Sequence, residues 1–592
     1  MARRLPQLRA FVDAHHRALL GATLLAALAL RVWVLGDLRK TIYFRALMPD
    51  EDTYHRWAVR IADATEGAGY APDFPRLPAR IFAAVYAVFG VDTMYLRVFN
   101  LLLGVAICAI AYFIGRSLYG RGAGLAAALL CAFSKGLVFH SATVMSTCLG
   151  LTAFALAFAV LVSCLMDPER HLGWKVAAFG GLCGLLANLR PNAAIIGVLI
   201  IPVLLLSRTK PAPAKASALR VLQLGILCGG VYLASAALAG SVSGPRFGYN
   251  LYIGNNPDNP SPYFRPVRFT SSAPEHQSTG FVVEAGRRAD RKLSPDEAEA
   301  FWTESVLEDA LARPGPFLAH LAQKALAIVH ASPADNNHDL RFTGSFVSSL
   351  RWAFLPSWLL LALGTACLAV LPFDRRLLIG AGAVALYSAT IVAFFAGERL
   401  RAPLLLLAAP YAGAALSQLC AAQLPQRRML ITRAGLIVLV SALAARVPVA
   451  CADDLSGPYN MHALMLFGEG DLAGAEHWYR GSLALGQLDS PGARIGLAAI
   501  LQKRGRSAEA VAMLEPLPDS HYEAASKHEW LGNLALGQRR LQAAIDAYET
   551  SLAIDSSRQN AYKGLYIAYR LLGEPSQAAA ADDRLQRILS FE

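Results

Sequence analysis

The sequence predicts an all-α protein in which a polytopic bundle of about eleven membrane-spanning helices is followed by a soluble α-solenoid. Of 592 residues, 55% are hydrophobic and only 17% are charged, whereas soluble proteins average about 45–50% and about 25%. The apolar residues gather before position 450 in runs long enough to cross a bilayer. After residue 455 the chain becomes amphipathic, and a small-residue pattern recurs about every 34 residues.

The membrane part begins with an apolar run at 18–36 that follows the basic start "MARR". This run is long, lacks a small-residue cleavage site and precedes further runs, so we expect an uncleaved first helix and not a signal peptide. The eleven expected spans are 18–36, 94–116, 121–139, 141–165, 172–189, 191–207, 217–240, 350–371, 376–396, 399–420 and 429–449.

Basic residues set the orientation of these spans. Clusters at 2–4, 116–121, 207–215, 374–376 and 426–428 all fall on one side of the membrane. The positive-inside rule makes that side cytoplasmic. The N-terminus is then cytoplasmic in a multi-pass protein of the inner (plasma) membrane, while the loops at 37–93 and 241–349 and the chain after 450 are extracytoplasmic. The net charge of +12 is explained by this topology, and we expect no nucleic-acid partner.

The C-terminal region, residues 451–592, is expected to be a separate domain from the membrane domain, residues 1–450. Its segments align so that four alanines superimpose at separations of 35, 34 and 34 residues: Ala475, Ala510, Ala544 and Ala578. A large side chain follows four residues after each of the first three: Tyr479, Leu514 and Tyr548. The period and the small residues resemble the tetratricopeptide repeat, whose stacked helix pairs bind protein partners. A helical-hairpin domain without a ligand remains the alternative.

An acidic segment follows the first span in the stretch "MPDEDTYHRWA" at 48–58. Pro49 and the three acids Asp50, Glu51 and Asp52 suit a helix N-terminus, and the following apolar residues have helical spacing. We therefore expect an amphipathic helix along the membrane surface. The acids either cap this helix or act as a general base or metal ligand beside a lipid-borne substrate.

Several segments in a fixed order resemble one enzyme family. After the acidic helix come "RLPARIFAAVYAVFG", "YLRVFNLLLG", "NLRPNAAIIGVLI", "FGYNLYIGNNP" and "GERLRAPLLLLAAPY". Together they resemble the GT-C glycosyltransferases, and more narrowly the bacterial relatives of the dolichyl-phosphate-mannose protein mannosyltransferases (glycosyltransferase family 39). The resemblance covers about residues 15–425.

This resemblance implies inverting transfer of a sugar from a polyprenyl-phosphate carrier to an acceptor hydroxyl, on a protein or glycan, at the extracytoplasmic face. Asp50 matches the proposed general base. Glu51 matches a second acid that either orients the acceptor or holds a cation, which leaves a divalent cation open as a cofactor. The candidates for binding the lipid phosphate are Arg97, Arg190, Arg399 and Arg401. Each arginine has the alternative of capping a helix or snorkelling.

One departure from the family concerns the turn "FHSATVMSTCLG" between the third and fourth spans. Many family members carry an acid there, but this chain has only His140, as a substitute or as polar filler. Two outer-loop segments, "NNPDNPSPYFRP" and "SPADNNHDLRF", are expected at the acceptor entrance or in simple turns. Their candidate residues are Asn255, Asn256, Asn337 and His338.

Two other functions compete with the enzyme. A transporter of lipid-linked sugars predicts charged residues at mid-membrane and internal repeats, and only Arg31 fits the first of these. A non-catalytic envelope-assembly scaffold would use the repeats as its working part, but the retained Asp50 and Glu51 favour catalysis.

Overall fold

The computed structural model describes residues 4–64, 74–207, 214–238, 246–267, 269–270, 277–335, 337–352, 354–485, 490–519, 523–555 and 558–591. Parts of both expected outer loops and of the basic segment at 207–215 lie outside these residues. Within them the fold is all-α, and the only β pairing is two isolated bridges. The chain divides into two compact units: residues 1–62, 75–264 and 303–452, and residues 63–74, 265–302 and 453–592.

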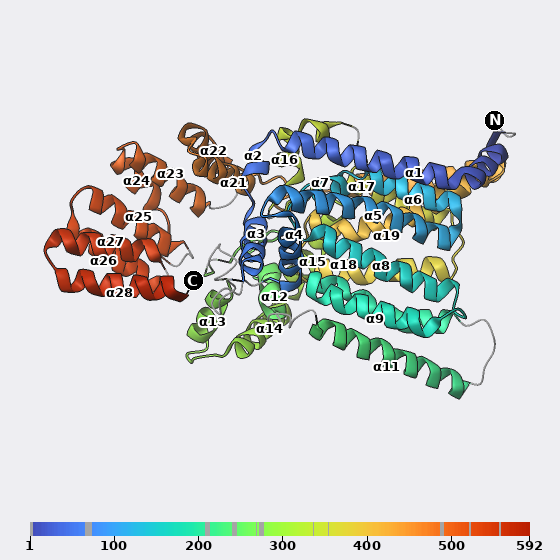
Figure 1. The fold of residues 1–592 in the computed structure, drawn as a ribbon, viewed down its shortest axis with the longest axis horizontal. Helices are drawn as coiled ribbons and strands as arrows, with labels where there is room; N and C mark the ends of the chain where they lie inside the picture. Colours follow the sequence, from blue (N-terminus) through green and yellow to red (C-terminus); the bar gives the residue numbers. More distant parts are fainter. Residues whose placement is uncertain are drawn as a thin grey trace. The chain divides into compact units, whose positions relative to one another are not determined.

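The first unit is a bundle of apolar helices (Figure 1). Its elements are α1 (Arg4–Leu38), α2 (Ile42–Arg45), α3 (Pro49–Ala62), α4 (Arg76–Phe89), α5 (Thr93–Tyr119), α6 (Arg121–Phe133), α7 (Lys135–His140), α8 (Thr147–Met166), α9 (Leu172–Leu189), η1 (Pro191–Leu199), α10 (Ile200–Leu206), α11 (Ala214–Leu238), α12 (Phe247–Asn255), α15 (Pro314–Val329), α16 (Leu340–Phe346), η3 (Ser348–Arg351), α17 (Ser357–Ala366), η4 (Cys367–Ala369), α18 (Arg375–Ala393), η5 (Arg399–Arg401), α19 (Ala402–Ala421) and α20 (Leu424–Ala444).

Seven helices of the described chain are long and apolar enough to cross a membrane, so the prediction of a multi-pass membrane protein is confirmed. Three shorter apolar helices cover 121–133, 191–206 and 357–369. The expected span 121–139 is not one helix. It breaks at Ser134, which bridges to Leu355. Lys135 N donates to Leu355 O at 2.9 Å, and Leu355 N donates to Phe133 O at 2.8 Å, so the broken backbone keeps its hydrogen bonds.

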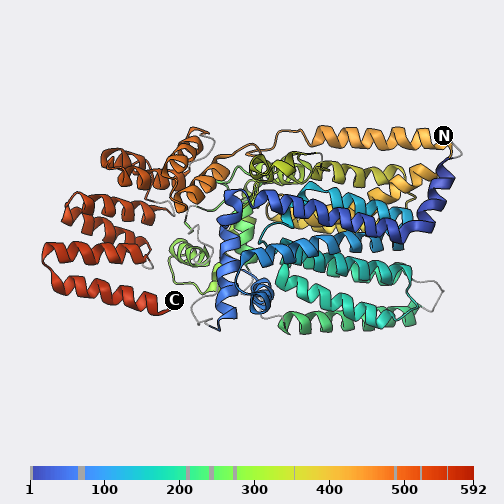
Figure 2. The same cartoon turned by 45° about the horizontal axis from the view of Figure 1, so that its top comes forward.

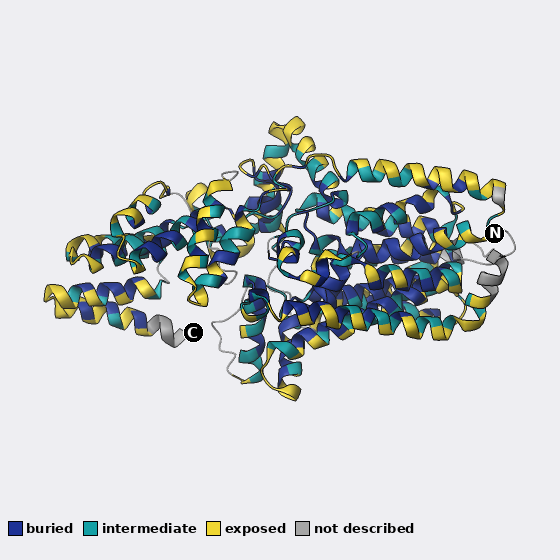
Figure 3. Ribbon diagram, turned by 90° about the horizontal axis from the view of Figure 1, so that it is seen from above, coloured by how far each residue is buried: buried dark blue, intermediate teal, exposed yellow. Residues whose placement is uncertain are grey.

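The centre of the bundle is α19, whose residues 402–415 are all buried. It packs on α6 and α17, and α5 and α6 pack on each other. The contact between α5 and α6 is close because Gly124 faces the Tyr112 carbonyl, where an added Cβ would lie only 2.5 Å away. Buried residues fill the bundle interior, while exposed apolar residues cover its outer helices (Figure 3).

Helices α3 and α4 lie across one end of the bundle, transverse to its long helices (Figures 1 and 2). The apolar residues Tyr54, Trp57 and Ala58 of α3 are buried, and α3 packs on α4. The helix is amphipathic as expected, but these residues contact protein and not lipid. The acidic first turn of α3 is thereby fixed at the end of the bundle.

Within the second unit, the described residues after 453 form eight helices in four successive pairs: α21 (Ser456–Gly468) with α22 (Leu472–Leu485), α23 (Pro491–Lys503) with α24 (Ser507–Leu514), α25 (Ala524–Gly537) with α26 (Leu541–Ile554), and α27 (Gln559–Leu572) with α28 (Pro575–Phe591). Each pair also packs on the next pair. This arrangement is TPR-like, as predicted. The four aligned alanines lie in the second helix of each pair and are at most 1% exposed.

The turn inside each pair has the same geometry. A residue in the left-handed region ends each first helix, with φ of +85°, +74°, +58° and +87°: Gly470, Gly505, Arg539 and Gly573. The amide of each of these residues bonds three residues back, and the next amide bonds five residues back. This is the Schellman motif, and it recurs at separations of 35, 34 and 34 residues.

Part of the expected outer loop belongs to the second unit. It includes α13 (Gln277–Arg288) and the start of α14 (Pro295–Ala312). The fully buried Trp302 stacks on Phe269, and its Nε1 donates to Phe281 O at 3.0 Å. Arg265 forms an ion pair of 2.6 Å with the buried Asp454. The unit is therefore assembled from this loop and the repeats.

Candidate active site

Asp50 lies in the first turn of α3, at the end of the bundle. Its Oδ2 accepts hydrogen bonds from Asn337 Nδ2 and from Arg399 Nη1, both at 2.8 Å. The Asp50 amide in turn donates to Asn337 Oδ1 at 3.2 Å. None of these three hydrogen bonds uses Oδ1 of Asp50, and the side chain is 12% exposed. Asp50 therefore has one oxygen held in place and one oxygen left for another group.

Glu51, the next residue, has a different environment. It is fully buried, with Oε2 accepting from Met48 N at 3.1 Å and Oε1 from Val144 N at 2.8 Å. His338 Nε2 lies 3.2 Å from Oε1. Burial alone would raise the pKa of Glu51, but His338, Arg97 and the Met48 amide more than offset it and lower the pKa to about 2. Glu51 joins α3 to the turn at 141–146.

Arg399 lies between two aspartates. Besides the ion pair with Asp50, its Nε is 3.8 Å from Asp335 Oδ1, and its backbone amide donates to Asp335 Oδ2 at 3.0 Å. Asp335 belongs to the expected loop segment "SPADNNHDLRF" but was not a site candidate. The sequence gives no sign that this loop reaches Arg399, since 64 residues separate the two.

The other arginine candidates occupy different positions. Arg190 follows α9, and its Nη2 donates to the Arg399 carbonyl at 2.6 Å, while its buried Nε has no hydrogen-bond partner among the described residues. Arg401 is 3% exposed and pairs with Glu398. Its Nη1 also donates to His330 O at 2.7 Å. The structure thus brings Arg190 to Arg399, while Arg401 is held by a local ion pair.

Arg97 and His140 are both buried; Arg97 lies near Glu51, and His140 lies near Asp335 and His338. Arg97 is fully buried, with Nη1 donating to Ala142 O at 2.8 Å and Nη2 to the carbonyls of Tyr43 and Phe44, each at 3.3 Å. His140 is 5% exposed, and its Nε2 has no hydrogen-bond partner in the described part of the chain. Arg97 thus already binds three carbonyls, which is the arrangement of a structural residue.

The loop candidates divide into two groups. Asn337 and His338 lie against Asp50 and Glu51, as described above. Asn255 instead caps α12, with Nδ2 donating to Ala393 O at 2.8 Å and Oδ1 accepting from the fully buried Lys324 at 2.6 Å. Asn256 bonds within its own turn, to Ile253 O and Asp258 N. The structure therefore gives Asn255 and Asn256 structural partners and no place beside the acids.

A divalent cation at Glu51 does not fit this donor set. Both carboxylate oxygens of Glu51 already accept backbone amides, and Oδ2 of Asp50 accepts two side-chain donors. Across the part of the chain that the structure describes, no three His, Cys, Asp or Glu side chains group so that they could hold a metal ion.

Comparison with protein families gives one match: residues 73–229 match the family described as dolichyl-phosphate-mannose-protein mannosyltransferase. This match confirms the resemblance read from the sequence, and with it the expectation of a GT-C glycosyltransferase. No curated protein matches the chain.

Solved structures also give matches, at low similarity. An oligosaccharyltransferase from Archaeoglobus fulgidus in the apo form is 16% identical, over 75% of this chain and 56% of its own, with a TM-score of 0.39. ArnT from Cupriavidus metallidurans, bound to undecaprenyl phosphate, is 13% identical over 85% of this chain and 84% of its own, with a TM-score of 0.40. The APC/C hetero-tetramer Cut9–Hcn1 is 13% identical over 92% of this chain and 94% of its own, with a TM-score of 0.23. The chain thus spans little more than half the length of the oligosaccharyltransferase.

Proposed function

We propose that this chain, a membrane glycosyltransferase of the GT-C family, moves a sugar from a polyprenyl-phosphate carrier to an acceptor hydroxyl at the extracytoplasmic face. One observation carries the proposal: a carboxylate with a free oxygen, Asp50, is joined to an arginine pair, Arg399 and Arg190, at one end of the membrane bundle. A base and a phosphate-binding group are the two parts that such a transfer requires.

The chemistry follows a single inverting displacement. Oδ1 of Asp50 takes the proton of the acceptor hydroxyl while the acceptor oxygen forms a bond to the anomeric carbon. The bond from that carbon to the carrier phosphate breaks, and the phosphate oxygen leaves with the electron pair. Arg399 and Arg190 stabilise the negative charge of the leaving phosphate through bidentate, charge-assisted hydrogen bonds. The unpartnered Nε of Arg190 gains an acceptor in this arrangement.

Arg399 is shared between the base and the phosphate. In this structure its Nη1 holds Asp50, while Asp335 holds its backbone amide and lies near its Nε. When the carrier phosphate arrives, it competes with Asp50 for the guanidinium, and Asp335 keeps the arginine in place. Asp50 is then free to accept the proton of the acceptor hydroxyl.

The remaining candidates have supporting roles in this proposal. Glu51 and Arg97 position α3 and the turn at 141–146. Arg401 stabilises η5 through its ion pair with Glu398. The repeats hold a macromolecular acceptor near the site, which raises its local concentration to the millimolar range. The extracytoplasmic placement rests on the distribution of basic residues.

Two aspartates in one helical turn provide the test. Asp50→Asn should lower the rate of transfer from a polyprenyl-phosphate hexose by about 10²- to 10⁴-fold, with thermal stability nearly unchanged and carrier binding not weakened. Asp52→Asn is the matched control, because Asp52 is 42% exposed and pairs with Arg56 on the surface of α3. A normal rate in Asp50→Asn would remove the base from the proposal.

Arg399→Met tests the phosphate-binding half. Loss of a charge-assisted hydrogen bond should weaken carrier binding by about 10- to 100-fold, measured as a raised KM for the polyprenyl-phosphate hexose. An unchanged KM would mean that Arg399 serves only to hold Asp50.

A further inference from the structure

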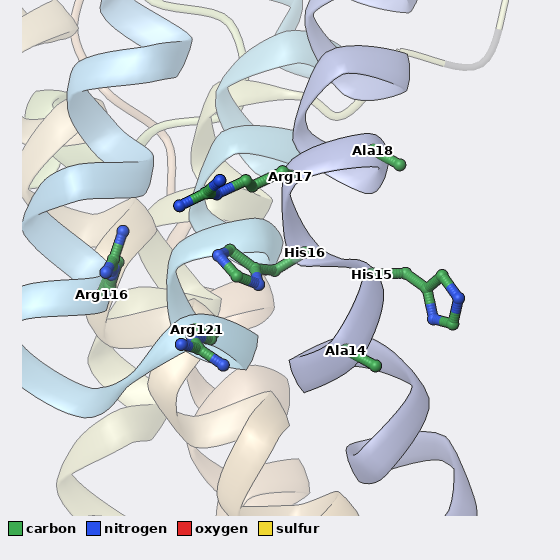
Figure 4. Close-up of a pocket in the computed structure, with 7 residues that line it drawn as sticks. All are labelled: Ala14, His15, His16, Arg17, Ala18, Arg116 and Arg121. Carbon is green, nitrogen blue, oxygen red and sulfur yellow. The ribbon is translucent and has the colours of Figure 1, made fainter.

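A cavity of about 420 Å³ opens between three helices of the membrane bundle. Its lining comes from α1, from the last turn of α5 and from the first residue of α6: Ala14, His15, His16, Arg17, Ala18, Arg116 and Arg121. Figure 4 shows Arg17, Arg116, Arg121 and His16 converging on one space from these helices, while His15 points away. The cavity is therefore lined by cationic groups from three separate elements.

These cationic groups have no carboxylate partner among the described residues. The guanidinium of Arg121 donates to the Asp13 carbonyl at 3.0 Å, and His16 Nδ1 lies 3.0 Å from the same oxygen. Neither Arg17 nor Arg116 makes an ion pair within the described chain. Three like charges around one cavity repel each other, and that repulsion is relieved when an anion binds.

The cavity lies at the opposite end of the bundle from Asp50. Helix α5 carries Arg97 near the acidic site and Arg116 at the cavity. The 19-residue separation along one helix corresponds to roughly 28 Å, which is close to the thickness of a bilayer's hydrocarbon core. The cavity therefore faces the opposite membrane surface, and the carrier phosphate beside Asp50 cannot reach it.

The surroundings of the cavity are those of a lipid. Phe113, one turn before Arg116 on the same face of α5, is 52% exposed, and on α1 Leu25 is 68% exposed. Both belong to helices long and apolar enough to cross the membrane. A molecule with a phosphate in the cavity can thus lay its acyl chains along an exposed apolar surface, which a free anion cannot use.

We propose that this cavity binds the phosphate-bearing headgroup of an anionic phospholipid, in the leaflet opposite the catalytic site. Basic cavities between membrane helices are suited to such headgroups, since the leaflet concentrates them and cations near the membrane surface attract them. The lipid bridges α1, α5 and α6, and so stabilises the packing of the first helix on the bundle. This inference does not depend on the proposed glycosyl transfer.

The test uses the full-length protein, purified in a neutral detergent and stripped of lipid. Thermal unfolding is followed with added phosphatidylglycerol, with phosphatidylcholine and with inorganic phosphate, and native mass spectrometry counts retained lipid. The double variant Arg116→Gln/Arg121→Gln removes two charges from the cavity. Arg427→Gln/Arg428→Gln is the matched control, because it removes two charges from the start of α20, outside the cavity.

Phosphatidylglycerol should raise the Tm of the wild type and of the control by several degrees, and the cavity variant should lose most of that shift and of the retained lipid. An equal shift with phosphatidylcholine, or a full shift in the cavity variant, would overturn the proposal. Equal protection by inorganic phosphate would mean a free-anion site and would also overturn it. If the double variant does not fold, the single variant Arg17→Gln provides the same comparison.

Discussion

The repeat region and the acidic site gather their buried residues along the chain in opposite ways. In the repeats, small residues and left-handed turns recur every 34 or 35 residues, and each helix pair packs on its neighbours. At the acidic site, the partners of Asp50 are 287 and 349 residues away in the sequence. A local pattern builds the first region, and the whole topology of the bundle builds the second.

This difference decides where a substitution acts. A change in one repeat disturbs that pair and its neighbours, because stability in such arrays is a sum of repeat and nearest-neighbour terms. A change at the acidic site separates elements from distant parts of the chain, so its effect spreads to the whole bundle. The four predictions below test this contrast, from the largest expected effect to the smallest.

Glu51→Ala should have the largest effect on stability. It leaves Arg97 and His338 buried beside a missing carboxylate, and removing one partner of a buried ion pair costs about 3–5 kcal/mol. We expect a strong loss of folded yield and a lower Tm. Asp50→Asn, in contrast, should keep the folded yield and the Tm of the wild type. A folded Glu51→Ala protein with normal Tm and no activity would instead give Glu51 a catalytic role.

Gly564→Leu should disturb the repeats alone. A Cβ at Gly564 would lie 2.2 Å from the ring of Tyr548, so the larger side chain overpacks the contact between α26 and α27. The expected cost is about 1–3 kcal/mol, measured by hydrogen exchange as opening of α25 to α28. Gly537→Ala is the matched control, since an added Cβ there has no neighbour within 4 Å. Loss of protection in the membrane helices would contradict the independence of the two regions.

Lys324 makes stability depend on pH. Burial lowers its pKa from 10.5 to about 7, so above pH 7 the unfolded chain binds more protons than the folded one. The free energy of unfolding therefore rises as the pH increases above 7, by about 1 kcal/mol over the first pH unit. Lys324→Met should remove this rise in a series of Tm measurements. A rise of the same size in the variant would assign it to another group.

Arg539→Gly should have the smallest effect and should stabilise the protein. Arg539 has φ of +58° in the turn where the other three pairs have glycine. A non-glycine residue there costs about 1–2 kcal/mol, of which the greater flexibility of glycine in the unfolded chain offsets part. We expect a gain of about 0.5–1 kcal/mol in the unfolding of the repeats, and Gly505→Arg should produce the opposite change. A loss of stability in Arg539→Gly would mean that the arginine side chain makes a compensating contact.

The sequence predicted these two regions with unequal success, because a local pattern builds the repeats and the topology of the bundle builds the acidic site. The alanines at 475, 510, 544 and 578 were found from their period alone, and each is buried in the second helix of its pair. The start of α3 was also predictable, since Pro49 and three acids mark a helix N-terminus. Both side-chain partners of Asp50, Asn337 and Arg399, were among the candidates. Asp335 was missed, because it meets Arg399 only through the packing of the bundle. Arg401 matches the same motif as Arg399, yet Glu398 holds it.

The broken helix at Ser134 has a consequence for the bilayer itself. Helix α6 has 13 residues, and the apolar helix that starts at Ser357 covers 357–369. Each is roughly 20 Å long, about 10 Å less than a typical hydrocarbon core. The two break points are joined by the bridge from Ser134 to Leu355. We expect the membrane to thin or dip at this place, so that lipid headgroups on that side would lie deeper than elsewhere. A long-chain carrier diffusing in the leaflet can reach such a depression without lifting its chain out of the hydrocarbon.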